Sequence, residues 1–310
     1  MKIRSVRSAP PFTELRDRMN YASTSDSGLA TRVAEIIGAV AAEGDTALLR
    51  FARELDGATE SSVADLRIPR DALADAAAQI GAEARGALER AAENIRRFHE
   101  RQLERGFMDL FPDGSMLGQR VLPLRRVGVY VPGGRASYPS TVLMNVVPAQ
   151  VAGVDEIVMV TPTPDGVIDP MVLAAAHLAG VSEVFRVGGA HAVGALAHGT
   201  ETVAPVDKIV GPGNRWVAEA KRQVFGRVDI DMIAGPSEIM VIADDTAEAR
   251  HVAADLIGQA EHDPDAIAWL VTTSERLAAA VPDEIQSLLK DNPRREVARE
   301  ALEANGLILL

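Results

Sequence analysis

The residues best suited to hold a metal ion lie near the end of one predicted helix. Residues 246–262 carry apolar positions at helical spacing and stop before Pro264. Gln259 and His262 are three residues apart, so they share a helix face, and Asp255 lies one turn earlier on it. Imidazole and oxygen donors bind zinc, but two donors do not complete a site. Two interpretations stay open: part of a metal site, or a helix-end histidine that contacts the last carbonyls or solvent.

Glycine-containing turns after three strand-like segments form a second candidate feature. A glycine at such a turn lets a ligand approach the backbone, and the helix N-terminus that follows favours a phosphate. None of the turns matches G-x-G-x-x-G, so each alone fits ordinary turn geometry equally well. Together they predict a nucleotide or another phosphate-bearing ligand across one edge of a sheet. The turns are Pro132-Gly133-Gly134, Gly188-Gly189 and Gly211-Pro212-Gly213.

Two further side chains could belong to a binding site. Tyr130 directly precedes the end of the first of these strands, and it is either a core aromatic or a ring that packs against a base or ribose. Ser237 lies in a small-residue turn between two strands, as a hydrogen-bonding group at a pocket wall or as a turn residue. The sequence has no G-x-S-x-G motif, which argues against a hydrolase serine.

The elements that must position these residues alternate between apolar strands and helices. This rhythm predicts an α/β fold with doubly wound, mostly parallel sheets in two Rossmann-like domains. Residues 28–105 predict a helical N-terminal region, and the first 22 residues have no clear periodicity. The predicted strands are 126–131, 156–162, 183–187, 207–210, 238–243, 266–272 and 307–310.

Composition narrows the class of protein. A chain of 310 residues suggests about two domains. The net charge of −12 argues against general binding to nucleic acid or to an anionic membrane. The absence of cysteine excludes disulfides, thiolate nucleophiles and cysteine-ligated zinc. The N-terminus lacks a signal-peptide core and no run of 18 apolar residues occurs, so we expect a cytoplasmic enzyme.

The last residues, 307–310, predict a buried strand with no helix after it. We expect from this that the chain is a fragment, or that the element covering the strand comes from elsewhere. An uncovered apolar strand would form an edge prone to aggregation.

Five collinear segments resemble the histidinol dehydrogenase family. The resemblance implies an enzyme that oxidises L-histidinol through the aldehyde to L-histidine, the last steps of histidine biosynthesis. It implies NAD and zinc as cofactors and a homodimer. The segments are VGVYVPGG (127–134), PSTVLMNVVPAQVAGV (139–154), GPGN (211–214), DMIAGPSEIMVIAD (231–244) and DLIGQAEHDP (255–264).

The resemblance also implies roles for individual residues. Gln259 and His262 correspond to zinc ligands, where the zinc holds the amine and imidazole of the substrate, and Ser237 corresponds to a residue of the substrate pocket. The positions that correspond to NAD contacts are Tyr130, His191 and Asn214.

We therefore expect three parts in the chain. Residues 1–22 form an N-terminal arm. Residues 127–237 form the NAD-binding α/β domain. Residues 23–126 and 238–310 together form a discontinuous domain for substrate and zinc, incomplete at its C-terminus.

Two departures from the family pattern bear on activity. His191 stands where the family usually has glutamine, which makes the hydrogen bonding at this position sensitive to pH. The family's catalytic glutamate–histidine pair and two further zinc ligands, an aspartate and a histidine, correspond to positions beyond Leu310, so we expect the chain alone to be inactive. Two alternatives remain: a relative that oxidises another alcohol, and a catalytically silent NAD-binding protein.

Overall fold

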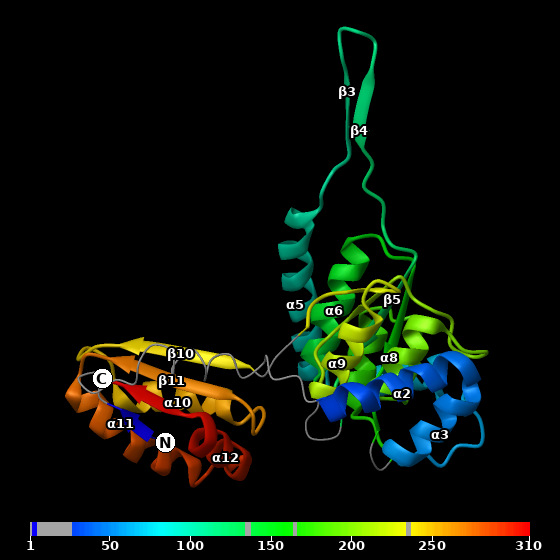
Figure 1. The fold of residues 1–310 in the computed structure, drawn as a ribbon. Helices are drawn as coiled ribbons and strands as arrows, with labels where there is room; N and C mark the ends of the chain where they lie inside the picture. The colour runs from blue at the N-terminus through cyan, green and yellow to red at the C-terminus, as the bar shows by residue number, and fades with distance from the viewer. Residues whose placement is uncertain (1, 5–26, 134–137, 164–165, 234–236) are drawn as a thin grey trace. The chain divides into compact units, whose positions relative to one another are not determined.

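The computed structural model describes residues 2–4, 27–133, 138–163, 166–233 and 237–310. The chain forms two compact units. The larger unit is Asp26–Ala234, and the smaller combines Met1–Ser25 with Gly235–Leu310. Both contain parallel strands covered by helices, which confirms the expected α/β class (Figure 1).

A six-stranded sheet forms the centre of the larger unit. Its order is β2-β7-β6-β5-β8-β9, and β2 alone is antiparallel to its neighbour. The chain begins the parallel part at β5, moves to β6 and β7 on one side, and returns to β8 and β9 on the other. The order therefore reverses between β5 and β8. The strands are β2 (Arg67–Ile68), β5 (Arg126–Tyr130), β6 (Glu156–Val160), β7 (Glu183–Phe185), β8 (Lys208–Val210) and β9 (Asp229–Ile230).

Helices cover both faces of this sheet because its strands bury side chains on each side. Val158 and Val160 of β6 pack in one core, and Ile157 and Met159 pack in the other. The first core contains residues of α2 (Ser27–Glu43), α3 (Asp45–Leu55), α8 (Gly189–His198) and α9 (Arg215–Val224). The second contains residues of α4 (Arg70–Gln79), α5 (Ala82–His99), α6 (Pro139–Val151) and α7 (Pro170–Leu178).

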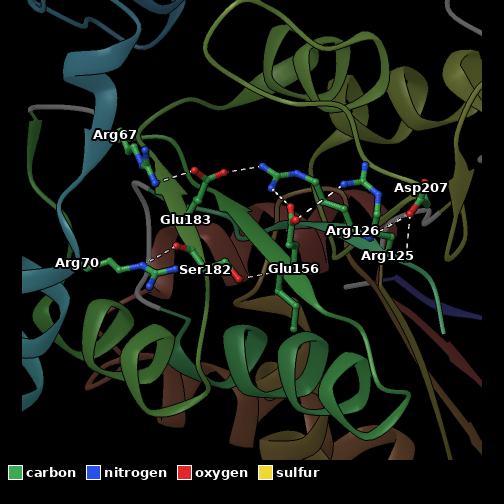
Figure 2. A network of polar contacts seen from close by, with 9 residues as sticks. Arg67, Arg70, Arg125, Arg126, Glu156, Ser182, Glu183 and Asp207 are labelled. Carbon is green, nitrogen blue, oxygen red and sulfur yellow. Dashed lines mark hydrogen bonds and ion pairs between the residues drawn. The ribbon is translucent and has the colours of Figure 1, made fainter.

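Charged side chains join the strands at the amino edge of this sheet (Figure 2). The buried Arg126 begins β5, and its guanidinium donates to Glu156 and Glu183, the first residues of β6 and β7, at 2.6 Å each. Arg67 of β2 also pairs with Glu183, at 2.7 Å, and Asp207 accepts the N–H of Arg126 at 3.0 Å. Burial by itself would lower the pKa of Arg126. The hydrogen bonds with Glu183 and Glu156 outweigh this effect, so the pKa lies above its ordinary value.

A β-hairpin extends from the larger unit, away from its sheet and helices (Figure 1). It consists of β3 (Phe107–Leu110) and β4 (Met116–Gln119), antiparallel, with all eight strand residues exposed. The sequence analysis did not predict it, and it also missed the short strands β2 and β9.

The smaller unit contains a four-stranded parallel sheet, ordered β1-β12-β11-β10. One face carries the helices α10 (Ala249–Ala260), α11 (Glu275–Leu289) and α12 (Arg295–Asn305). The expectation of an uncovered final strand is wrong, because β12 (Leu307–Leu309) lies buried between β11 (Ile267–Thr272) and the N-terminal β1 (Lys2–Arg4). β10 (Glu238–Ala243) lies at the edge. The strand that pairs with the outer side of β12 is β1, which comes from the other end of the chain.

Contacts within the chain divide it at other residues than the expected grouping of residues 23–126 with 238–310. Residues 26–126 belong to the same compact unit as 127–234, because α2 packs on α8 and α9, α4 packs on α7, and β2 pairs with β7. Of the expected arm, residues 2–4 form β1, and residues 1 and 5–22 lie outside the described residues. Within the described ranges, no helix has the length and apolar character needed to cross a membrane.

Candidate functional site

The carboxyl ends of β5 and β8 meet where the strand order reverses, which is where doubly wound sheets bind ligands. Gly211 follows β8 with a φ of +111°, a conformation that L side chains rarely adopt. A Cβ atom at this position would lie 2.1 Å from the carbonyl oxygen of Tyr130. The turn after β8 therefore needs glycine so that it can pack against the end of β5.

The other glycine turns are also explained by close packing. A Cβ on Gly133 would lie 2.2 Å from the carbonyl oxygen of Pro162, and one on Gly188 would lie 2.4 Å from its side chain. Gly134 lies outside the described residues. These glycines thus let neighbouring turns approach each other, and their presence does not require a ligand.

The N-terminus of α8 is occupied by groups of the protein itself. The N–H of Gly188 donates to the carboxylate of Asp56 at 2.8 Å, and the N–H of Gly189 donates to the hydroxyl oxygen of Tyr130 at 3.0 Å. Both leading N–H groups therefore have internal acceptors. A phosphate at the Gly188-Gly189 turn would have to displace these two oxygen atoms.

Tyr130 lies in the core of the larger unit, with 3% of its surface exposed. Burial raises the pKa of its hydroxyl well above the ordinary value; the hydrogen bond from Gly189 opposes this shift and the charge of Asp56 adds to it. The ring of Tyr130 packs among the apolar residues of this core. Its hydroxyl oxygen holds the backbone of the neighbouring turn.

His191 is fully buried in the first turn of α8. Its Nε2 lies 3.0 Å from the carboxylate of Asp56, and its ring lies 6.2 Å from that of Phe51, tilted by 40°. Its Nδ1 has no hydrogen-bond partner among the described residues. A carboxylate acceptor favours the proton on Nε2, which leaves Nδ1 as an acceptor when the ring is neutral.

Asn214 caps the helix that follows the Gly211 turn. Its side-chain oxygen accepts hydrogen bonds from the N–H groups of Trp216 at 3.0 Å and Val217 at 3.2 Å. An asparagine at this position satisfies N–H groups that have no acceptor within the helix. The cap uses only the oxygen atom, and the amide nitrogen of Asn214, an exposed residue, makes no hydrogen bond to another described residue.

Three residues at this edge, Asp56, Lys221 and Asp231, were not among those expected from the sequence. Asp56 reaches Gly188 and His191 across more than 130 residues of chain, and no local pattern indicates such a contact. Lys221 did leave a signal, because it shares one face of α9 with buried apolar residues. A lone charged residue on an apolar stripe needs a buried partner.

The candidate metal ligands lie in the smaller unit at the end of α10. Gln259 is in the last turn, and its side-chain nitrogen is buried without a hydrogen-bond partner among the described residues. His262 lies two residues beyond the helix and is exposed, as is Asp255. The backbone N–H of His262 donates to the carbonyl of Gln259 at 3.2 Å. In the described part of the chain, no group of three or more His, Asp or Glu residues could hold a metal ion.

Ser237 directly precedes β10, and its side chain is exposed. Its carbonyl oxygen accepts a hydrogen bond from Ile267 at 3.1 Å, which joins the start of β10 to the start of β11. The backbone of Ser237 thus begins the sheet of the smaller unit, and its hydroxyl stays exposed.

The reversal of strand order between β5 and β8, together with the asparagine-capped helix at that edge, defines a doubly wound α/β protein. The histidinol dehydrogenase family model matches residues 19–310. The chain belongs to the histidinol dehydrogenase family, as the sequence motifs predicted.

Sequence and structural similarity to individual proteins supports this family assignment. The histidinol dehydrogenase of Pseudomonas aeruginosa is 50% identical over 309 residues, which cover 99% of this chain and 70% of the relative. That of Aquifex aeolicus is 52% identical over 301 residues, covering 96% and 69%. The crystal structure of histidinol dehydrogenase from Elizabethkingia anophelis matches with a TM-score of 0.88 at 36% identity, covering 100% of this chain and 71% of that one.

Proposed function

We propose that this chain belongs to an NAD-dependent histidinol dehydrogenase that oxidises L-histidinol through the aldehyde to L-histidine in the cytoplasm. The observation that carries the proposal is the 50% identity to the Pseudomonas aeruginosa enzyme along 99% of the chain. A resemblance that runs through both compact units supports the function better than the fold alone, because one fold serves many reactions.

NAD is proposed to bind at the carboxyl edge between β5 and β8. The available amide donors of Asn214 support this position, since they can hydrogen-bond to a ribose or a phosphate. The buried hydroxyl of Tyr130 accepts the N–H of Gly189. The buried His191 contacts Asp56, which accepts the N–H of Gly188. These contacts hold the turn beside the proposed site and thereby support it. NAD supplies the hydride acceptor of the reaction.

Zinc is proposed to bind at the end of α10 through Gln259 and His262. An imidazole nitrogen from His262 and an amide oxygen from Gln259 are donor types that suit zinc. Two donors do not close a tetrahedral site, so we expect zinc to bind weakly to these two residues alone. Gln259 and His262, with Ser237 beside β10, would then orient the substrate.

Oxidation of an alcohol needs a base that removes the hydroxyl proton while a hydride leaves the same carbon. The family resemblance gives this task to a glutamate–histidine pair that matches no residue of this chain. The role proposed for the present residues is therefore to bind and orient cofactor and substrate, and turnover by the chain alone is expected to be absent.

We also propose that the chain forms a homodimer. The β3–β4 hairpin supports this, because a two-stranded ribbon is only marginally stable when it stands alone in water. Both of its faces expose apolar side chains: Phe107 and Leu117 on one, Met108 and Leu110 on the other. Light scattering should give the mass of a dimer, and Leu110→Asp should shift it towards monomer while Asp109→Asn on the same hairpin should not. A monomeric wild type would contradict the proposal.

The function is tested by measuring NADH formation with L-histidinol and a panel of other alcohols. The protein from its natural source should oxidise L-histidinol, and the 310-residue chain should bind NADH without turnover. Oxidation of another alcohol in preference to histidinol would favour the first alternative. NADH binding with no turnover by the natural protein would favour the silent binding protein.

A further inference from the structure

A lysine–aspartate pair lies behind the turn that follows β8, with the lysine buried and the aspartate partly exposed. Lys221 of α9 is 2% exposed, and its ammonium group donates to the carbonyl oxygen of Gly211 at 2.9 Å and to the carboxylate of Asp231. That carboxylate in turn accepts the N–H of Gly211 at 2.8 Å. A single ion pair therefore holds both polar backbone groups of Gly211.

This pair fixes the start of the turn that presents Asn214. Gly211 packs against the carbonyl of Tyr130 and has a positive φ, so its peptide has little freedom to move. Three residues later, the side-chain cap of Asn214 fixes the start of α9. The turn 211–214 is thus held at both ends, by the ion pair at one and by the cap at the other.

Asp231 also fixes the backbone of the residue that follows it. Its carboxylate accepts the N–H of Met232 at 2.7 Å. Met232 lies just before the boundary at which the chain leaves the larger unit for the smaller. The same carboxylate therefore links the turn at the ligand edge to the beginning of the connection between the two units.

A buried ion pair is costly to desolvate, and apolar residues of similar volume often stabilise a protein as well or better. Val217, Ala220 and Val224 share the buried side of α9 with Lys221, so an apolar residue would suit its position. The pair does what an apolar residue could not: it binds the N–H and the carbonyl of Gly211 and the N–H of Met232.

We propose that Lys221 and Asp231 are positioning residues for dinucleotide binding, which keep the turn 211–214 and the start of the connection at Met232 in one fixed arrangement. The proposal rests on the proposed NAD site. Neither side chain needs to touch the ligand. Loss of the pair should release the Gly211 peptide, and a displaced binding group loses affinity steeply with small shifts in position.

The test measures NADH binding by fluorescence titration with the 310-residue chain, alongside amide hydrogen exchange. Lys221→Met and Asp231→Asn should each weaken NADH binding by about tenfold or more. They should speed exchange at Gly211 and Met232, while exchange in β5 and β6 stays unchanged. Lys208→Met and Asp229→Asn are matched controls, because this pair joins β8 and β9 at 2.7 Å but is much more exposed. They should change neither measurement.

Affinity within about twofold of wild type in both folded variants would overturn the proposal. Faster exchange spread evenly over the whole sheet would also overturn it, because that is the signature of a purely structural role. If Lys221→Met does not fold, Asp231→Asn decides, since it keeps the side-chain shape. If the wild type does not bind NADH, the proposed cofactor is wrong, and unchanged exchange at Gly211 and Met232 in Asp231→Asn would then refute the pair's role.

Discussion

The two edges of the six-stranded sheet differ in what their charged side chains mainly bind. At the amino edge, Arg126 joins the first residues of β6 and β7 through their carboxylates, so charged side chains bind one another across strands (Figure 2). At the carboxyl edge, the carboxylates of Asp56 and Asp231 and the ammonium of Lys221 bind backbone groups of the turns.

We infer that charges at the amino edge mainly stabilise the fold and that charges at the carboxyl edge mainly fix the conformation of the turns. Side-chain pairs at the amino edge join neighbouring strands, and Asp207 also accepts the N–H groups of Arg125 and Arg126 where β5 begins. Charges at the carboxyl edge hold turns made of glycine, which has no side chain to pack. They therefore determine the backbone conformation of the turns at the proposed binding edge. Changes at the amino edge should therefore reduce stability more than binding, and changes at the carboxyl edge should do the reverse.

The largest loss of stability is expected from Arg126→Met. It removes the buried guanidinium and leaves Glu156 and Glu183 close together without it. Loss of one partner of a buried pair costs about 3–5 kcal/mol, and the partial exposure of both glutamates reduces this to about 2–4 kcal/mol. Urea unfolding measures it. Arg125→Met, at a side chain that is 66% exposed, should cost under about 0.5 kcal/mol. Weaker NADH binding by folded Arg126→Met would break the proposed separation of the two edges.

Asp56→Ala should have the next largest effect. It removes the acceptor shared by the N–H of Gly188 and the Nε2 of His191, which leaves two buried donors without a partner at a cost of about 2 kcal/mol. Hydrogen exchange at Gly188 should accelerate more than the loss of global stability explains. Glu54→Ala, an exposed change on the same helix, is the control. A cost above that of Arg126→Met would reverse the order of the two edges.

A smaller loss is expected from Tyr130→Phe. The ring stays in the core, but the N–H of Gly189 loses its acceptor, at a cost of about 1 kcal/mol. Thermal unfolding measures the cost, and NADH titration shows whether the turn at Gly188 has changed. Tyr138→Phe, at the start of α6, is the control. An unchanged stability and affinity would mean that water replaces the hydroxyl and that the turn does not depend on Tyr130.

Much of the fold was predictable from the sequence, because apolar runs such as 126–131 and 156–162 lie where β5 and β6 are observed. The short strands and the hairpin were not, since β2 has two residues and the hairpin residues are exposed on both faces. The neighbours of β12 could not be derived either. Pairing between residues 2–4 and 307–309 is a long-range contact that no local pattern encodes.

The position of the candidate residues in the fold was predictable, but their contacts were not. The glycine turns follow the carboxyl ends of parallel strands, as expected from the sequence, and the cap by Asn214 follows from its place before a helix. The glycines themselves serve close packing, as Gly211 against Tyr130 shows. The residue types carry no information about which N–H a distant carboxylate will accept, so Asp56 and Asp231 emerged only from the structure.

The smallest effect is expected at His198, which ends α8 on the side of the sheet away from the glycine turns. Burial, and then the charge of Arg227, lower the pKa of its imidazole below the ordinary value. Below about pH 6.5 the unfolded chain therefore binds a proton that the folded chain takes up only at lower pH. His198 thus makes the protein less stable as the pH falls through this range, and the penalty is complete once the folded form is protonated too.

His198→Asn should remove this part of the pH dependence, so its stability relative to wild type should improve as the pH falls below about 6.5. Urea midpoints measured above and below that pH test the difference. His177→Asn, at an exposed histidine near the end of α7, is the control substitution for the same measurement. NADH affinity of His198→Asn should match wild type at both pH values, because His198 contributes nothing to the turns. A pH-dependent affinity change would show that charge at the far end of α8 reaches the carboxyl edge, and the two edges would then not be independent.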